Sequence, residues 1–178
     1  EMRKRLYKVA ESGVKLSDVL NEMNSSSNNS GNSGNAAPLS YYEQYLEIYK
    51  RMYKSDHPDV ANSLHGVANT YQTMGDCKRA LDFHQQTLEM RQRIYKEDHP
   101  AIASSLIGLG NASFGMANYQ QALKHYVKAL EMNRRIYAAS GVHAEIANSL
   151  ECVGKAHESL GQRKVATERY MEAVEMLK

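Results

Sequence analysis

The feature that most constrains this chain is an internal repeat with a period of 42 residues. The tripeptide Asp-His-Pro at residues 56–58 recurs at residues 98–100. The preceding segments match as well, because residues 47–54 align with residues 89–96 and both align with residues 131–138. A fixed period of this length indicates stacked supersecondary units, each of which buries its apolar face against its neighbours. We therefore expect one continuous array of repeats.

Three leucines set the register of the repeats: Leu64, Leu106 and, after a two-residue insertion, Leu150. Position +4 from each leucine is small, position +16 is alanine and position +24 is apolar. These residues are Ala68, Gly110 and Gly154; Ala80, Ala122 and Ala166; and Leu88, Leu130 and Val174. We expect the small residues to let paired helices approach closely, while the larger ones fill the space between successive pairs.

Each repeat is predicted to contain two helices. Apolar residues between positions 60 and 71 follow the helical period. Pro58 suits a first helical turn and keeps His57 out of the helix. The pair Gly75-Asp76 then ends the first helix, and a second helix follows. The predicted helices lie near residues 14–23, 40–54, 59–74, 77–95, 101–116, 119–138, 144–160 and 163–177, with a terminal fragment over residues 2–9.

The repeats divide the chain into four segments. Residues 1–54 are expected to form a degenerate repeat with a flexible loop rich in Ser and Asn at residues 24–37, because such a composition buries too little apolar surface to become ordered. Full repeats follow at residues 55–96, 97–138 and 139–178. We expect these four segments to form one solenoid domain, taken as a slice of a longer array.

A period near 42 also occurs in β-propellers and in HEAT repeats. The helical apolar period excludes a propeller, and the spacing of Leu64, Ala68, Gly75, Ala80 and His84 disfavours HEAT. That spacing resembles the tetratricopeptide repeat. Together with the Asp-His-Pro motif and the long second helix, residues 39–178 resemble the 42-residue variety found in kinesin light chains. The resemblance implies an all-α, right-handed superhelical solenoid of antiparallel helix pairs, whose first helices line a concave groove.

The resemblance also implies which side chains line that groove, at fixed offsets from each leucine. The candidate binding residues are Asn62, His65, Asn69, Gln72, Ser104, Asn111, Phe114, Asn148, Glu151 and Lys155. Asparagine is a poor residue for a helix interior, so its recurrence needs a reason. A carboxamide both donates and accepts, which suits the backbone of an extended peptide. Hydrogen bonding of these asparagines to a neighbouring helix or to water explains the pattern equally well.

Two known specificities of such grooves are not supported by the sequence. The carboxylate-clamp variety has Lys at position +1, where this chain has His65, Ile107 and Glu151. Kinesin-light-chain grooves take acidic peptides, but here Lys155 lies between Glu151 and Glu158. The sequence therefore predicts neither a receptor for chaperone tails nor one for acidic peptides.

No catalytic motif was found among the glycine-rich, nucleophile-elbow and zinc-binding patterns. His57 and His99 recur at helix starts, where we expect capping or packing. His84 replaces an aromatic residue and is expected in the core. Cys152 and His157 are five residues apart and so lie off a common helix face, which favours an ordinary apolar cysteine. We expect no enzyme activity and no cofactor.

Charge and composition narrow the partners. The chain has 22 basic and 20 acidic side chains without clustering, which argues against nucleic acid. No apolar run is long enough for a bilayer, so no membrane partner is expected. Residues Glu89, Arg91 and Arg93 are interpreted as a solvated convex face. The two cysteines favour a reducing, cytoplasmic setting.

The leading hypothesis is a non-catalytic scaffold for protein-protein interaction that binds a peptide or a partner helix in the concave groove. One alternative is the regulatory or sensor region of a larger multidomain enzyme or nucleotide-driven switch. Another is a purely structural role, in which exposed repeat ends stack. We expect a monomer or weak self-association through those ends.

Overall fold

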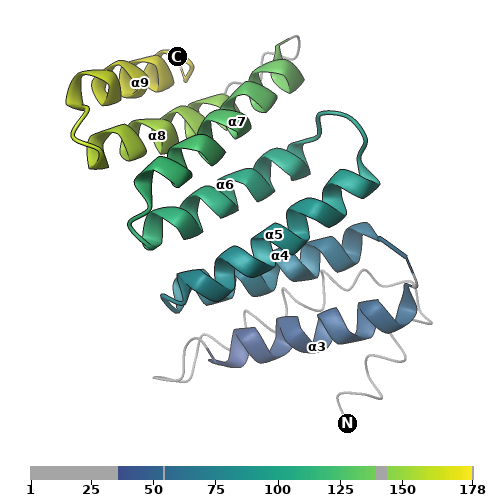
Figure 1. The fold of residues 1–178 in the computed structure, drawn as a ribbon. Helices are drawn as coiled ribbons and strands as arrows, with labels where there is room; N and C mark the ends of the chain where they lie inside the picture. The colour runs from purple at the N-terminus through teal and green to yellow at the C-terminus, as the bar shows by residue number, and fades with distance from the viewer. Residues whose placement is uncertain (1–35, 54, 139–143, 178) are drawn as a thin grey trace. The chain divides into compact units, whose positions relative to one another are not determined.

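The computed structural model describes residues 36–53, 55–138 and 144–177. Within these ranges the chain is helical and contains no β-strand (Figure 1). The helices are α3 (Ala36–Met52), α4 (Pro58–Thr73), α5 (Cys77–Ile94), α6 (Pro100–Gly115), α7 (Tyr119–Tyr137), α8 (Ala144–Ser159) and α9 (Arg163–Glu175). The predicted all-α fold is confirmed. The predicted segments at residues 2–9 and 14–23 lie outside the described residues.

Helix α3 begins at Ala36, inside the segment that we predicted to be a loop over residues 24–37. The helix thus starts four residues before the predicted position 40. Two alanines, which are strong helix formers, open it, and Pro38 falls in its first turn. The rest of the predicted loop lies outside the described residues.

The Asp-His-Pro motif starts a first helix through its histidine. The Nδ1 atom of His57 accepts a hydrogen bond of 3.2 Å from the backbone N–H of Asp59, and the imidazole stacks on Tyr53 at 3.5 Å between ring centroids. The same cap and stack recur at His99. The predicted capping role of both histidines is confirmed, since each accepts from an N–H without a partner inside the helix.

Short turns separate the helices of each pair. Gly75 has φ of 82°, a left-handed conformation that glycine adopts without steric cost. Asp76 follows and caps α5 by accepting from the backbone N–H of Arg79. Gly161 has φ of 77° at the corresponding turn before α9.

Paired helices meet where a ring lies against a glycine. A Cβ atom built on Gly110 of α6 would lie 2.3 Å from the ring of Tyr126 in α7, and one on Gly154 would lie 2.6 Å from Tyr170. Ala122, also predicted at a close approach, is fully buried. The predicted role of the small positions is confirmed, because larger side chains there would collide with the partner helix.

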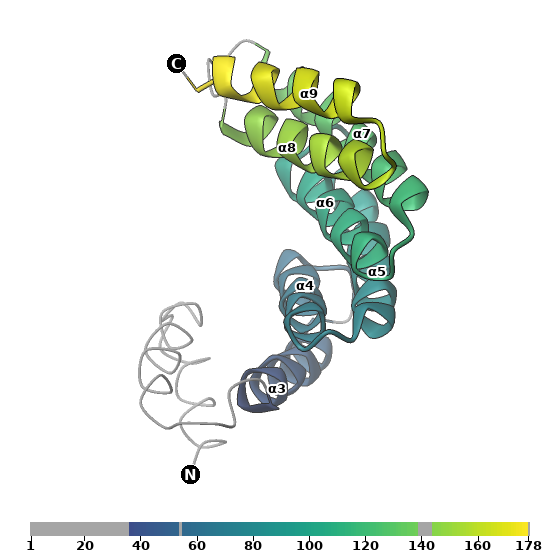
Figure 2. The same cartoon turned by 90° about the vertical axis from the view of Figure 1, so that its left-hand side faces the viewer.

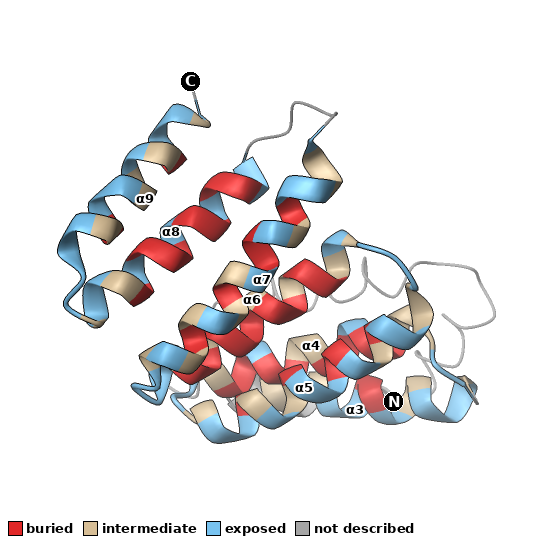
Figure 3. Cartoon of the chain, turned by 45° about the horizontal axis from the view of Figure 1, so that its top comes forward, coloured by how far each residue is buried: buried red, intermediate tan, exposed pale blue. Residues whose placement is uncertain are grey.

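Residues 39–178 form one compact unit in which each helix packs on the next. The helices α4, α6 and α8 are the first helices of their pairs, and α5, α7 and α9 are the second helices (Figure 2). First helices also contact one another, α4 with α6 and α6 with α8, more than second helices do. In Figure 3 the buried residues run along α6 and α8, whereas α9 is mostly exposed.

Candidate functional site

The ten predicted binding residues all lie on the first helices α4, α6 and α8, with the spacing of one helix face on each. We call this set of residues the inner face. Its exposed members are Asn62, Asn69, Asn148, Glu151 and Lys155, and its half-buried members are His65, Gln72, Ser104, Asn111 and Phe114. Each first helix therefore brings a strip of accessible side chains to the inner face.

Two asparagines of the inner face are held by the array itself. The Oδ1 atom of Asn62 accepts from Nη2 of Arg91 at 3.0 Å, and Oδ1 of Asn111 accepts from the hydroxyl of Tyr126 at 2.7 Å. Among the described residues, nothing accepts from either Nδ2 group. The carbonyl end of each amide is thus fixed, and the donor end stays available to a ligand.

The other two asparagines, Asn69 and Asn148, are exposed and make no side-chain hydrogen bond within the described part of the chain. The two interpretations of the recurring asparagines therefore divide by position. A structural partner occupies half of the amide at Asn62 and Asn111. Asn69 and Asn148 have no such hydrogen bond from an arginine or a tyrosine, although Asn69 has the same register as Asn111.

The prediction that Arg91 belongs to a solvated convex face of α5 is wrong. The side chain of Arg91 is only 5% exposed. Besides Asn62 on α4, the guanidinium donates from Nη1 to the carbonyl of Ala101 at 2.7 Å and to Oγ of Ser105 at 2.8 Å, both on α6. The long side chain reaches past its own helix, so Arg91 joins three helices. Arg93 and Glu89 are exposed, as predicted.

His65 on the inner face meets His84 of α5, with ring centroids 5.2 Å apart. His84 is fully buried, which confirms its predicted place in the core. Burial, and then the nearby Arg91, lower the pKa of His65 to about 4. Burial is also the main cause that lowers the pKa of His84 to about 3, followed by His65 and Arg91. Both imidazoles are therefore neutral near pH 7, and the α4 part of the inner face carries no histidine charge.

The family resemblance also implies that position +2 from each leucine lines the groove, at Gly66, Gly108 and Cys152. In the structure these three residues pack against rings instead. A Cβ on Gly108 would lie 2.4 Å from the ring of His84, and one on Gly66 would lie 2.4 Å from Tyr42. Cys152, at the same register, is buried, and burial raises the pKa of its thiol. These residues receive a ring of the preceding second helix.

The remaining inner-face residues differ in accessibility. The ring of Phe114 makes an edge contact with Tyr119 at 5.1 Å and packs against the core around α8, so only part of it is accessible. The Oε1 atom of Gln72 is buried, with no hydrogen-bond partner among the described residues. Glu151 and Lys155 place one charge of each sign on α8.

Sequence reasoning missed two residues that shape the site, Arg91 and Tyr126. The signal for Tyr126 was present, because a tyrosine at that register can reach the amide at position +5 of its own repeat. No comparable signal pointed from Arg91 to Asn62, since the two lie 29 residues apart, near the start of α4 and the end of α5.

The sequence model of the tetratricopeptide repeat family matches residues 39–93 and 80–135, which together cover more than half of the chain. The chain belongs to the tetratricopeptide repeat family. Folds of this family generally serve as scaffolds for protein interaction. No curated protein sequence matches the chain.

Solved structures with the same fold include tetratricopeptide proteins of the kinesin-light-chain type. BtubC (BKLC) from P. vanneervenii aligns with a TM-score of 0.72 and 19% identity, over 78% of this chain and 54% of that one. A putative kinesin light chain from Podosopora anserina, with nearly identical TPR-like repeats, aligns with a TM-score of 0.67 and 21% identity, over 78% and 64%. The predicted resemblance to kinesin-light-chain repeats is confirmed at the level of fold.

A Rap protein solved in complex with competence and sporulation factor aligns with a TM-score of 0.61 and 20% identity, over 98% of this chain and 52% of that one. The chain thus spans between about half and two thirds of the length of these three structures.

None of the described helices combines the length and apolarity needed to cross a bilayer. No group of three or more metal-ligating side chains occurs among the described residues.

Proposed function

We propose that this protein is a non-catalytic scaffold whose inner face binds an extended peptide. The observation that carries the proposal is the row of asparagine amides on α4, α6 and α8. Arg91 and Tyr126 hold the carbonyl ends of two of them, which leaves their N–H groups unbonded by described residues. Donors fixed in this way lose little freedom when they bind backbone carbonyls of a ligand.

The charge of the inner face indicates how the peptide would be recognised. Its α4 and α6 parts carry amides, one hydroxyl, one neutral imidazole and the edge of one phenyl ring. Only α8 contributes charges, at Glu151 and Lys155. We expect hydrogen bonds between the asparagine side chains and the backbone of the peptide to supply most of the affinity. Phe114 should contact one apolar side chain of the peptide. We place this activity in the cytoplasm, in keeping with two cysteines that are free thiols.

The test uses a peptide selected from a random library on the immobilised full chain, with affinity then measured by calorimetry. The double variant Asn69→Ala with Asn111→Ala should bind it at least ~10-fold more weakly, because each lost amide partner costs about 1 to 3 kcal/mol. The control is Gln86→Ala with Lys128→Ala, two exposed residues of the second helices. Loss of binding in the control pair, with the asparagine pair unaffected, would refute the proposal.

A further inference from the structure

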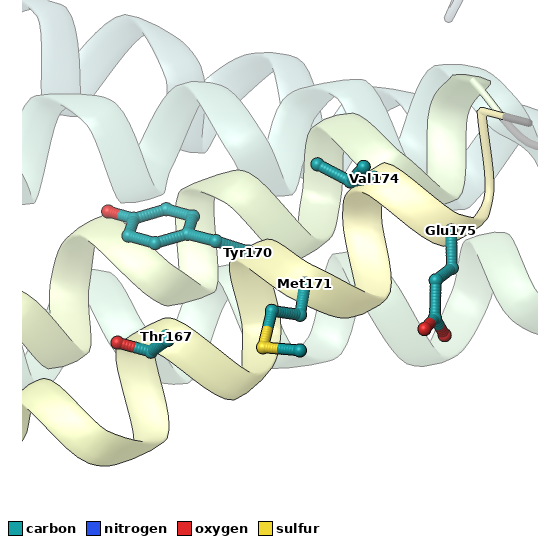
Figure 4. Close-up of a pocket in the computed structure, with 5 residues that line it drawn as sticks. All are labelled: Thr167, Tyr170, Met171, Val174 and Glu175. Carbon is teal, nitrogen blue, oxygen red and sulfur yellow. The ribbon is translucent and has the colours of Figure 1, made fainter.

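A hollow of about 230 Å³ lies between the second helices α5 and α7, and we call it the α5–α7 hollow. Its lining residues are Leu81, Asp82, Gln85, Leu109, Gln121 and His125. Leu109 alone comes from a first helix, α6, and none of the inner-face residues lines the hollow. Three helices form its walls, whereas a hollow of about 270 Å³ on α9 is lined by residues of that one helix (Figure 4).

The repeat register shows what occupies the same place one repeat earlier. Three lining residues of the α5–α7 hollow correspond, 42 residues before, to residues of α3 and α5. The pairs are Gln85 with Glu43, Gln121 with Arg79, and His125 with Phe83. All three counterparts contact one side chain of α4, that of Tyr71.

Tyr71 is held by a hydrogen bond and by two planar groups. Its hydroxyl donates to Oε1 of Glu43 at 3.1 Å. Its ring stacks on Phe83 with 5.5 Å between centroids, and the guanidinium carbon of Arg79 lies 4.5 Å from the ring centroid. Tyr71 is only 5% exposed. A phenol ring therefore fills the place between α3 and α5 that corresponds to the α5–α7 hollow.

The residue of α6 that corresponds to Tyr71 is Ser113. Its hydroxyl donates to the carbonyl of Leu109 in the same helix at 2.8 Å, so this short side chain does not take the place of a ring. Surrounding structure relaxes only in part around a missing large side chain, which leaves space behind. The α5–α7 hollow thus lies where the array has no phenol of its own.

The walls of the α5–α7 hollow keep the groups that hold a phenol. Gln85 is exposed, and its Oε1 can accept a hydrogen bond as Oε1 of Glu43 does, while its Nε2 donates to Glu89 at 2.8 Å. Burial, and then the nearby Lys128, lower the pKa of His125, so its imidazole is a neutral flat ring near pH 7. The leucines of the lining supply apolar contacts.

We propose that the α5–α7 hollow binds the tyrosine side chain of a partner protein. The ring stacks on His125 and contacts Leu81 and Leu109, and the hydroxyl donates to Oε1 of Gln85. Asp82 and Gln85 are exposed, so a ring can enter while the backbone that carries it stays outside. The contacts of Tyr71 within the same chain support the assignment. Because the hollow is separate from the inner face, both can be occupied at once.

The probe is the peptide acetyl-Gly-Tyr-Gly-amide, titrated into the full 178-residue chain and followed by nuclear magnetic resonance of backbone amides. Saturable shifts should occur in α5 and α7 beside the hollow, at millimolar peptide. Gln85→Ala should weaken binding ~5-fold, because one neutral hydrogen bond is lost. The matched control Gln86→Ala changes the next residue, which is exposed and does not line the hollow, and should leave binding unchanged.

A gain of affinity tests the hydroxyl contact directly. Gln85→Glu restores the carboxylate that Tyr71 meets at Glu43, so the tyrosine peptide should bind several-fold more tightly. The peptide acetyl-Gly-Phe-Gly-amide lacks the hydroxyl. It should bind the original chain ~5-fold more weakly than the tyrosine peptide, and Gln85→Glu should not strengthen its binding.

Several results would overturn the proposal. The absence of saturable shifts beside the hollow, or equal effects of Gln85→Ala and Gln86→Ala, would mean that the hollow binds no ring. Equal affinity for the two peptides would mean that the hydroxyl is not recognised. Binding of p-cresol without binding of the tyrosine peptide would assign the hollow to a free phenol. A dimer in sedimentation that Gln85→Ala dissociates would make a second copy of the chain the occupant.

Discussion

His84 takes the place of a tyrosine, and one methyl group accounts for the difference. Tyr126 packs on Gly110, where a Cβ would lie 2.3 Å from its ring. The counterpart of Gly110 in the preceding repeat is Ala68, which has that Cβ and is fully buried. A smaller imidazole fits there. The cost is that neither ring nitrogen of His84 has a hydrogen-bond partner among the described residues.

Stability should therefore fall as the solution becomes mildly acidic. The pKa of His84 is lowered to about 3 and that of His65 to about 4, chiefly by burial. In the unfolded chain both titrate near pH ~6.5. The unfolded state thus binds more protons between these values, so stability present above pH ~6.5 is lost as the pH falls below it. Urea melts at pH 5 should have lower midpoints than melts at pH 7.

The double variant His84→Tyr with Ala68→Gly isolates the effect of one histidine. Glycine removes the methyl group, and the new hydroxyl can reach Asn69 as Tyr126 reaches Asn111. The change in midpoint between pH 5 and pH 7 should be smaller than in the original chain. Ion-paired carboxylates such as Asp56 do not interfere, because the guanidinium of Arg93 holds the pKa of Asp56 below its ordinary value. An unchanged pH dependence would show that the burial of His84 does not contribute to the pH dependence of stability.

Two arginines two residues apart should differ strongly in their effect on stability. Arg91→Gln removes charged hydrogen bonds to α4 and α6 from a buried site and should cost at least about 2 kcal/mol of unfolding free energy. Arg93→Gln breaks only an exposed ion pair with Asp56, so its effect should be small. Chemical denaturation of both variants gives the comparison. Equal losses would mean that the bonds of Arg91 add no stability.

At the scale of elements, most helix limits could be predicted because local residues determine them. Pro58 and Pro100 start first helices, and Gly75 ends one, at the positions that their conformational preferences require. The start of α3 was missed because a polar low-complexity run directly precedes two alanines. A helix was predicted only from the apolar pattern that begins later, although Ala36 and Ala37 already favour helix.

The inner face could be predicted in position but not in detail. Register places Asn62 and Asn111 on first helices, and the structure agrees. The repeat register does not tell how far a side chain of another helix extends, so the hydrogen bond from Arg91 to Asn62 was not predicted. Local patterns specify helices, whereas the contacts of long side chains such as Arg91 depend on the three-dimensional packing of several helices.

The close approach of paired helices can be tested at Ala122, which begins the second turn of α7 and is fully buried. Ala122→Leu should lower the unfolding free energy by about 1 to 3 kcal/mol, because the added carbons have no space between α6 and α7. The control is Gln120→Leu, which adds the same side chain at an exposed position. If urea melts of the two variants coincide, the register that aligns Ala80, Ala122 and Ala166 is wrong.

At the scale of the whole described array, each helix is stabilised by its neighbours. Helix α6 packs against α4, α5, α7 and α8, whereas α9 packs substantially only on α8. In a linear array the free energy of opening a helix depends on such nearest-neighbour interfaces. The interior of the array should therefore be its most stable part, and α9 should open before α6.

Amide hydrogen exchange followed by mass spectrometry can measure this gradient. Peptides from α6 should exchange most slowly and peptides from α9 fastest among the described helices, because opening α9 disrupts one interface and opening α6 disrupts four. Val174→Asp should change the α9 rates little, since Val174 is 57% exposed. Equal protection of α6 and α9 would mean that the array opens as one unit, contrary to the nearest-neighbour expectation.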